Sequence, residues 1–260
     1  MYYIFLFILS VLPVIILGKY VYNKDRNKEP KKVLTKLFLF GICSVIITLL
    51  LTNVLEIFFP FLKLEMEDLD FTHKFIYIFI GVALIEELSK FIFAYTMFKS
   101  KHFDEFFDMI VYATFVSLGF ACFENILYVF EQGAFVGIIR ALLSVPGHAC
   151  YGVFMGYYLS IAKLNIINDR KDLFKKNLLK SLLIPTMLHG IYDFCILSGY
   201  YYLLLIFIVF IVLLYRNTLQ KIKDARGINK KLNGEVVEYC YKCGSVKSGT
   251  YCANCGTKLE

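Results

Sequence analysis

The sequence predicts an all-α polytopic membrane protein with about seven transmembrane helices and a small C-terminal zinc ribbon. Hydrophobic residues make up 58% of its 260 residues, and the mean hydropathy is +0.64. Water-soluble domains contain nearer half apolar residues. The apolar runs are also long enough to cross a bilayer, which takes about 20 helical residues at a rise of about 1.5 Å each. Finally, four of the eight cysteines form two CxxC pairs near the C-terminus.

The predicted spans follow one another along the first 215 residues. They cover residues 2–22, 33–59, 75–98, 109–130, 135–162, 178–197 and 200–215. The first is not expected to be a cleaved signal peptide, because no cationic segment precedes it and no small-residue cleavage site occurs before Lys19. Only the turn at Ser198 and Gly199 separates the last two spans, so one bent hairpin is the alternative for that pair.

The basic residues predict how the chain is oriented in the membrane. Lysine and arginine cluster in the first loop, in the loop around Ile166 and directly after the last span. These clusters alternate with an acidic loop at residues 65–70 and a nearly uncharged loop at residues 131–137. Because positive loops stay in the cytoplasm, we expect a plasma-membrane protein with its N-terminus outside and its C-terminus inside. The net charge of +7 is then explained by the basic loops that set the membrane orientation, and no nucleic-acid partner is expected.

Ionisable side chains are concentrated in the third to sixth spans, although a charge at mid-bilayer costs about 2.5 to 3.5 kcal/mol. These spans contain Glu86, Glu87, Lys90, Glu124, Arg140, His148, His189 and Asp193. Counting along the helices places Glu86, His148 and His189 near the middle of a hydrocarbon core about 30 Å thick. Glu124 lies somewhat nearer the outside. These groups are therefore expected to meet.

Helical spacing pairs several of these groups. Lys90 follows Glu86 by four residues and Glu87 by three, so it can neutralise either carboxylate. Asp193 follows His189 by four residues and can orient the imidazole. Arg140, by contrast, is expected to form a structural ion pair.

Small residues and prolines surround the two histidines. Gly147, Gly152 and Gly156 follow the spacing of close helix packing, which would bring His148 near a neighbouring helix. Pro146 and Pro185 precede the histidines and are expected to loosen the helices and admit water.

Such a constellation can activate water in two ways. The histidines and one glutamate could hold a zinc ion while the other glutamate acts as general base. Alternatively, a glutamate could activate water directly while a histidine or Asn125 stabilises the oxyanion. Both routes hydrolyse a peptide bond, and the sequence does not choose between them.

Three other interpretations of the buried charges compete with hydrolysis. Pairs of charges can simply tie helices together, each tie contributing about 0.6 to 2 kcal/mol. A proton- or metal-coupled transporter or sensor could use the same acids as a relay, although we find no inverted repeat of the kind that favours transport. In the third interpretation, the protein is a catalytically silent scaffold that presents the zinc ribbon.

The motifs that contain these residues resemble those of the PrsW-type intramembrane proteases. Residues 85–90 (IEELSK) resemble the family's EExxK motif, and residues 119–125 (GFACFEN) resemble its GFxxxEN motif. Residues 147–157 and 189–194 are similar to its two histidine segments, and residues 25–30 resemble the family more weakly. The resemblance covers about residues 1–216. The distantly similar CAAX prenyl endopeptidases and bacteriocin-immunity proteases carry a histidine where this chain has Glu124.

The resemblance implies an intramembrane endopeptidase that cuts a single-pass membrane protein, of the anti-sigma-factor type, in response to envelope stress. It implies catalysis by Glu86, Glu87 and either His148 or His189, with Glu124 in the same site. Lys90, Asn125 and Asp193 are expected to support them. Some descriptions call the family metalloproteases, whereas relatives are described as glutamate-dependent, so a catalytic metal on His148 and His189 stays open.

The tail is predicted to be a separate zinc-binding module. Cys240 and Cys243 form one CxxC pair, and Cys252 and Cys255 form the other after eight intervening residues. Four such thiolates are typical ligands of structural zinc, and a disulfide is disfavoured in a reducing cytoplasm. We therefore expect a protease domain at 1–216, a basic linker at 217–238 and a ribbon at 239–260, with the ribbon available to a cytoplasmic partner.

Overall fold

The computed structural model describes residues 1–232, 240, 242–243, 251–252 and 254–258, with side chains in the first segment up to residue 228. The α-helices are α1 (Tyr2–Lys24), α2 (Lys31–Phe58), α3 (Phe71–Ile76), α4 (Ile85–Tyr95), α5 (Asp108–Gln132), α6 (Ala134–Leu142), α7 (Ser144–Ile167), α8 (Lys171–Leu197) and α9 (Leu203–Leu232). Short helical turns lie at η1 (Pro60–Lys63), η2 (Met66–Asp68) and η4 (Thr96–Lys99), and a π-helix, η3, at Tyr77–Leu84. In the described residues the only strand-like pairing is one bridge in the tail. The predicted all-α class is confirmed.

Five helical segments are long and apolar enough to cross a membrane. They are α1, α2, α5, the pair α6–α7 and α9 up to Ile228. The predicted spans at residues 75–98 and 178–197 are helical but do not reach this threshold. Residues 75–98 are divided among α3, η3, α4 and η4, each shorter than 18 residues, and polar residues such as Lys180, His189 and Asp193 lower the hydropathy of residues 178–197. The polytopic architecture is thus established, whereas the count of seven and the orientation stay predictions.

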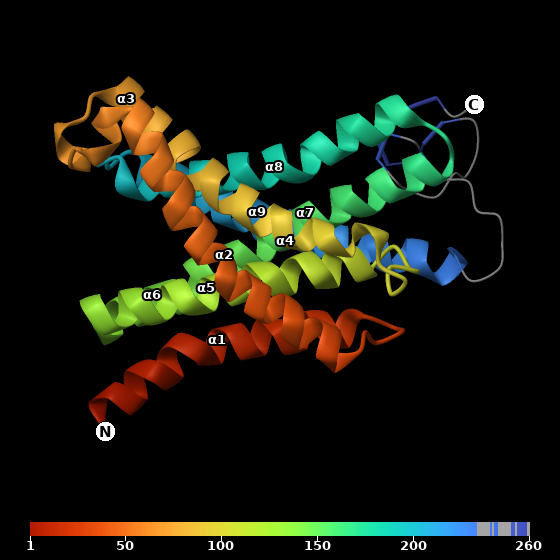
Figure 1. The fold of residues 1–260 in the computed structure, drawn as a ribbon, viewed down its shortest axis with the longest axis horizontal. Coiled ribbons are helices and arrows are strands. Elements are labelled where there is room, and N and C mark those ends of the chain that lie inside the picture. Colours follow the sequence, from red (N-terminus) through yellow and green to blue (C-terminus); the bar gives the residue numbers. More distant parts are fainter. Residues whose placement is uncertain (233–239, 241, 244–250, 253, 259–260) are drawn as a thin grey trace.

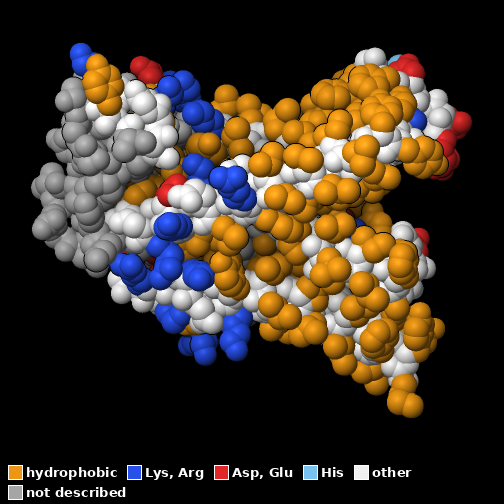
Figure 2. Space-filling view, turned by 180° about the vertical axis from the view of Figure 1, so that it is seen from behind, with side chains coloured by type: hydrophobic (Ala, Val, Ile, Leu, Met, Phe, Trp, Pro, Cys, Tyr) orange, Lys and Arg blue, Asp and Glu red, His pale blue; other side chains and the backbone are white. Residues whose placement is uncertain are grey.

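Helices α1, α2 and α9 lie at the periphery of the bundle, and α5 lies at its centre, as the buried share of each helix shows. Only 28% of the apolar stretch of α1 and 22% of those of α2 and α9 are buried, whereas 72% is buried in α5. Figure 2 shows hydrophobic side chains over much of one face, with lysine and arginine gathered mainly toward one end and acidic side chains visible at both ends. A surface so apolar is expected to face lipid, because its exposure to water would be energetically unfavourable.

The central helices approach one another closely because glycines line their contacts. Helix α5 packs on α7 and on α2 (Figure 1). A Cβ atom at Gly156 would collide with the backbone of Met109 and Ile110, and one at Gly152 would meet the backbone of Thr114. The close packing predicted for α7 is therefore present. Gly147 faces the Tyr151 and Tyr192 side chains instead.

The predicted span at residues 135–162 consists of two helices rather than one. Helix α6 ends at Leu142, and α7 begins at Ser144 after Leu143 adopts φ −120° and ψ −61°. Pro146 explains the break, because its ring has no N–H and clashes with the carbonyl group four residues earlier. The sequence prediction placed the loosening near His148, but the interruption lies one turn before it.

Candidate active site

The carboxylates of α4 follow directly on a change of helix type. The π-helix η3 ends at Leu84, and α4 begins at Ile85, so Glu86 and Glu87 stand in its first turn. Lys90 is fully buried, with its Nζ atom 2.8 Å from Oε1 of Glu87 and 3.3 Å from Oε2 of Glu86. The predicted pairing by helical spacing is therefore present for both glutamates. π-helical turns occur frequently at functional sites.

His148 connects α7 with α4 and α5. Its Nδ1 atom accepts from Lys90 at 3.2 Å, and its Nε2 atom lies 2.9 Å from Oε2 of Glu124. Because Nδ1 serves as acceptor, Nε2 carries the proton and donates to Glu124. His148 is only 3% exposed. Its ring is thus held between a cation on one side and a carboxylate on the other.

Arg140 of α6 contacts both Glu124 and its neighbour Asn125. Its Nη2 atom forms an ion pair with Oε2 of Glu124 at 3.1 Å, and its Nε atom donates to Oδ1 of Asn125 at 3.1 Å. The amide of Asn125 donates in turn to the carbonyl oxygen of Ser10 in α1 at 2.8 Å. Arg140 is therefore ion-paired, as expected, and Asn125 points toward α1 and α6 rather than toward the two histidines.

His189 lies between carboxylates from two helices. Its Nδ1 atom is 3.1 Å from Oε1 of Glu87, and its Nε2 atom is 3.2 Å from Oδ2 of Asp193 and 3.9 Å from Oε2 of Glu86. Acceptors at both nitrogens favour an imidazole that carries two protons. Tyr151 stacks on this ring, with centroids 4.9 Å apart and planes at 21°. Asp193 therefore orients the imidazole, as the spacing predicts.

All of the sequence-predicted site residues except Asn125 thus gather around the two histidines, whose ring centroids are 5.2 Å apart. Glu86, His148 and His189 each offer one ligand atom, and these atoms lie within 4.8 Å of one another. The similar membrane depths predicted from the sequence for Glu86, His148 and His189 therefore agree with their proximity in the structure. What each residue does in catalysis stays a prediction.

A cavity of about 520 Å³ lies beside this cluster. Its lining includes Glu86, Glu124, His148, His189 and Asp193, together with Arg140, Tyr151 and Tyr192. The cavity extends to Glu67, an exposed acid in the turn η2, which precedes α3. Neither Glu87 nor Lys90 lines it. The two adjacent glutamates therefore have different surroundings, because only Glu86 faces the open space.

Sequence reasoning missed three features of the site. Tyr151 stands three residues after His148, so helical spacing could have placed it on the same face. The π-helix left no signal, because the run from Tyr77 to Leu84 is apolar throughout. The third is the contact of α8 with this π-helix, where a Cβ atom at Gly190 would collide with the ring of Phe79.

Comparison with known proteins decides the family. Residues 29–215 match the model of the PrsW family of intramembrane metalloproteases. The chain belongs to the PrsW family. It is 33% identical to a Protease PrsW of Clostridioides difficile (87% of this chain, 94% of the relative) and 36% identical to one of Oceanobacillus iheyensis (83% and 94%). Identity to Protease PrsW of Bacillus subtilis is 37% (85% and 95%). No solved structure matches the chain at a significant level.

Membership in the PrsW family confirms three predictions made from the sequence. The protein is an intramembrane endopeptidase, and it is a multi-pass membrane protein. Its motifs also correctly indicated the PrsW family. The transporter or sensor alternative is not favoured. The match to the PrsW model begins at Glu29 and ends at Tyr215, so the four-cysteine tail lies outside it.

The donor set of this PrsW site fits a divalent metal ion by its chemistry. Two imidazoles and one carboxylate beside a cavity are a donor set typical of catalytic zinc. Glu87 and Glu124 contact the two rings, as carboxylates commonly do at metal sites. Both nitrogens of His148 are already engaged, so an ion would have to displace Lys90 or Glu124. Both nitrogens of His189 face carboxylates, so a metal ion would compete there with a proton.

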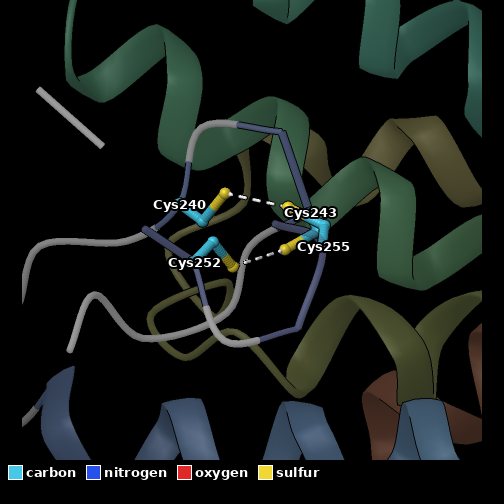
Figure 3. A group of neighbouring side chains, drawn as sticks. All are labelled: Cys240, Cys243, Cys252 and Cys255. Atoms are coloured by element: carbon cyan, nitrogen blue, oxygen red, sulfur yellow. Dashed lines mark hydrogen bonds between the residues drawn. The ribbon is translucent and has the colours of Figure 1, made fainter. Parts of the chain in front are cut away.

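The cysteines of the tail form a second candidate metal centre (Figure 3). The Sγ atoms of Cys240 and Cys255 are 3.5 Å apart, those of Cys243 and Cys252 are 3.4 Å apart, and all four sulfurs lie within 4.8 Å. A disulfide requires about 2.05 Å, so these thiols are not paired covalently. Gly256 adopts φ +68°, which allows the turn after the second CxxC pair. Gly244 lies outside the described residues.

The tail also contacts the helix bundle. The hydroxyl group of Tyr157 in α7 donates to the carbonyl oxygen of Cys243 at 2.7 Å. Tyr157 is only 1% exposed, and the Nζ atom of Lys221 in α9 lies 4.2 Å from the centre of its ring. The four thiols are therefore placed beside α7 and α9, and they can bind one metal ion there.

Proposed function

We propose that the protein cleaves a single-pass membrane protein, of the anti-sigma-factor type, and that Glu86 activates the attacking water. The observation that carries this proposal is the convergence of Glu86, His148 and His189 on one cavity inside the bundle. A protease needs water at a peptide bond that lipid would otherwise shield, and this cavity joins the buried acids to the exposed Glu67.

In the proposed reaction, Glu86 accepts a proton from a cavity water while the oxygen of that water attacks the carbonyl carbon of the substrate. His189 lies beside Glu86 and donates a proton to the departing amide nitrogen, after which Glu86 returns its proton to the ring. Glu87 and Asp193 keep His189 oriented and charged. If a divalent ion were bound instead, Glu86, His148 and His189 would be its ligands and would not carry these proton transfers, and the ion would supply polarisation of the scissile carbonyl group.

The other residues of the site are proposed to position these groups. Lys90 compensates Glu87 and holds His148 through Nδ1. Glu124 holds the opposite side of His148 and is itself held by Arg140. Asn125 links this support to α1 through Ser10, so its role is structural rather than stabilisation of the oxyanion.

The membrane placement and the tail complete the proposal. Basic loops on one side favour the plasma membrane with the N-terminus outside and the ribbon in the cytoplasm. Four cysteine ligands favour zinc in the tail, which would supply the folding energy of so short a module. We divide the chain into a protease domain at 1–216, a linker at 217–238 and a ribbon at 239–260 that docks a cytoplasmic partner or substrate.

A cleavage assay tests the proposal. The purified full-length protein in detergent is given a library of transmembrane peptides, and products are identified by mass spectrometry. We expect cleavage within apolar sequence by the wild type and by Glu56→Gln, a control acid in α2 that does not line the cavity. We expect no cleavage by Glu86→Gln or His189→Ala. Wild-type rates in both of these variants would reject the assigned site.

A further inference from the structure

A second group of acids lies at the end of the bundle opposite the mouth of the cavity. It forms where the loop between α1 and α2 meets the loop before α5, as Figure 1 shows. The loop carboxylates are Asp25, Glu29, Asp104, Glu105 and Asp108. None of them takes part in the active site, although Asp25 and Glu29 belong to the segment that resembles the PrsW family only weakly.

The loop carboxylates converge on Asp108. Ligand oxygens of Asp25, Glu105 and Asp108 lie within 4.8 Å of one another, and so do those of Glu29, Asp104 and Asp108. Asp108 therefore belongs to both groups. Convergence of this kind from two separate loops brings like charges together, which is unfavourable unless something compensates them.

The most deeply buried of these groups have oxygens without partners. Asp25 is 4% exposed, and neither of its carboxylate oxygens accepts a hydrogen bond among the described residues. Asp108 is fully buried; its Oδ2 atom accepts from the backbone amides of Asp104 and Glu105 at 3.0 and 2.6 Å, but its Oδ1 atom has no partner within the described chain. Unpaired buried carboxylates are costly, so the oxygens need a ligand.

No side-chain cation of the described chain compensates Asp25, Glu29, Asp104 or Asp108 by an ion pair. The nearby Lys28 instead donates to the carbonyl oxygen of Tyr22 at 3.1 Å, and its Nζ atom lies 4.5 Å from the centre of the Tyr22 ring. Two neutral side chains donate hydrogen bonds to the cluster. Asn27 donates to Glu105, and the hydroxyl group of Tyr112 donates to Glu29 at 2.6 Å.

The active site shows the opposite arrangement. Glu87 has Lys90 at 2.8 Å, and Glu124 has Arg140 at 3.1 Å. Glu87 and Glu124 are thus ion-paired to side-chain cations, whereas among the described residues Asp25 and Asp108 are not. A bound cation would compensate these two acids.

We propose that the loop carboxylates bind a hard divalent cation, of the Ca²⁺ class, which ties the loop between α1 and α2 to the start of α5. Hard cations prefer oxygen ligands, and Ca²⁺ takes six to eight of them in flexible geometry. Asp25, Glu105 and Asp108 supply one set of oxygens, and Glu29 and Asp104 extend it. The site contains no sulfur or imidazole ligand of the kind that selects zinc.

Protonation is the competing way to remove the charge. Burial raises the pKa of Asp25 to about 6 and the pKa of Glu29 to about 7 when no cation is bound. In that case carboxyl groups of the cluster would be protonated, and no metal ion would bind. The two explanations make opposite predictions for metal binding and for the neutral variant Asp25→Asn.

Terbium luminescence provides the test, because Tb³⁺ occupies Ca²⁺ sites and tyrosine sensitises it. Tyr112 contacts the cluster directly, and the chain contains no tryptophan. Full-length protein in detergent is titrated with Tb³⁺ in a Glu86→Gln background, so that the active site does not contribute. The same samples are heated with Ca²⁺, with Mg²⁺ or with chelator. Asp68→Asn, in the opposite exposed loop, is the matched control.

We expect tyrosine-sensitised Tb³⁺ emission, its displacement by Ca²⁺ more readily than by Mg²⁺, and a higher Tm with Ca²⁺. Asp25→Asn should weaken Tb³⁺ binding at least about tenfold, since loss of even an outer-shell ligand partner typically costs that much. Asp68→Asn should behave as the parent. Absence of Tb³⁺ emission and of a Ca²⁺-dependent Tm in the parent would overturn the proposal, and so would equal Tb³⁺ affinity in Asp25→Asn. Should Asp25→Asn not fold, Asp104→Asn, at an exposed member of the cluster, replaces it.

Discussion

The Nδ1 atom of His189 lies 3.1 Å from Oε1 of Glu87, a fully buried carboxylate that does not line the cavity. Glu86 precedes it in the chain and does line the cavity. Successive residues of an α-helix point about 100° apart, so two adjacent carboxylates face different surroundings. We infer that Glu86 meets water, whereas Glu87 maintains the charge arrangement of Lys90 and His189.

Substitution of the two glutamates should therefore have different effects. Glu86→Gln should reduce kcat by about 100-fold or more, the usual contribution of a general base, with little loss of stability. Glu87→Gln should lower the free energy of unfolding by about 3 kcal/mol, because it leaves Lys90 buried with only Glu86 to compensate it. Denaturation in detergent and the kinetics of peptide cleavage measure the two effects.

Equal losses of stability in the two variants would contradict this division of roles. Glu56→Gln serves as the control, because this acid of α2 lies outside the cavity. It should change neither kcat nor the free energy of unfolding by a measurable amount.

Lys90 is predicted to be coupled to Glu87 in stability. Its ammonium group is fully buried and contacts Glu87, Glu86 and His148. Lys90→Met alone should cost about 3 to 5 kcal/mol, because it leaves buried carboxylates without their cation. The double variant Lys90→Met with Glu87→Gln should cost clearly less than the sum of the single costs. A strictly additive double-mutant cycle would show that the pair does not interact.

Much of this site could be predicted from the sequence because helical geometry is local. The spacings of Glu86 to Lys90 and of His189 to Asp193 fix which side chains share a face, and the structure shows both pairs in contact. The depth of each residue in its span follows from a constant rise per residue. These two rules sufficed to bring His148 and His189 together.

The remaining features depend on tertiary packing that spacing does not encode. The π-helix η3 has uniformly apolar residues and packs through Phe79 against Gly190. The break at Leu143 falls before Pro146 rather than at the histidine. The cluster around Asp108 required the meeting of two loops separated by more than one helix. Such features appear only when distant segments are placed together.

Arg140 is predicted to support catalysis through Glu124 and His148. Its ion pair with Glu124 and its hydrogen bond to Asn125 hold the acid that accepts from His148. Arg140→Gln should lower kcat about tenfold, as loss of an orienting partner typically does, and change KM little. Arg140→Lys keeps the positive charge but lacks the planar guanidinium group that can contact Glu124 and Asn125 together. Its kcat should lie between those of the wild type and Arg140→Gln. Wild-type kcat in Arg140→Gln would show that this support is dispensable.

The tail is predicted to bind one zinc ion independently of the protease site. Replacing Cys240 and Cys243 by serine should remove one zinc per chain, because two of the four clustered ligands are lost. Cleavage of a short transmembrane peptide should stay near the wild-type rate. Plasma mass spectrometry measures the bound metal. The matched control Cys43→Ser, in α2 and far along the chain from the tail, should keep the zinc. Full zinc content in the double variant would reject the site.

The most direct test of the central claim measures whether water reaches residue 86 inside the membrane. In reconstituted vesicles, and in a background without reactive native cysteines, Glu86→Cys is treated with a water-soluble thiol reagent. Ile92→Cys, on an exposed position of the same helix, is the control that faces lipid. We expect rapid modification at residue 86, protection there by a transmembrane peptide and no modification at residue 92. A cysteine at residue 86 that reacts no faster than one at residue 92 would contradict the claim.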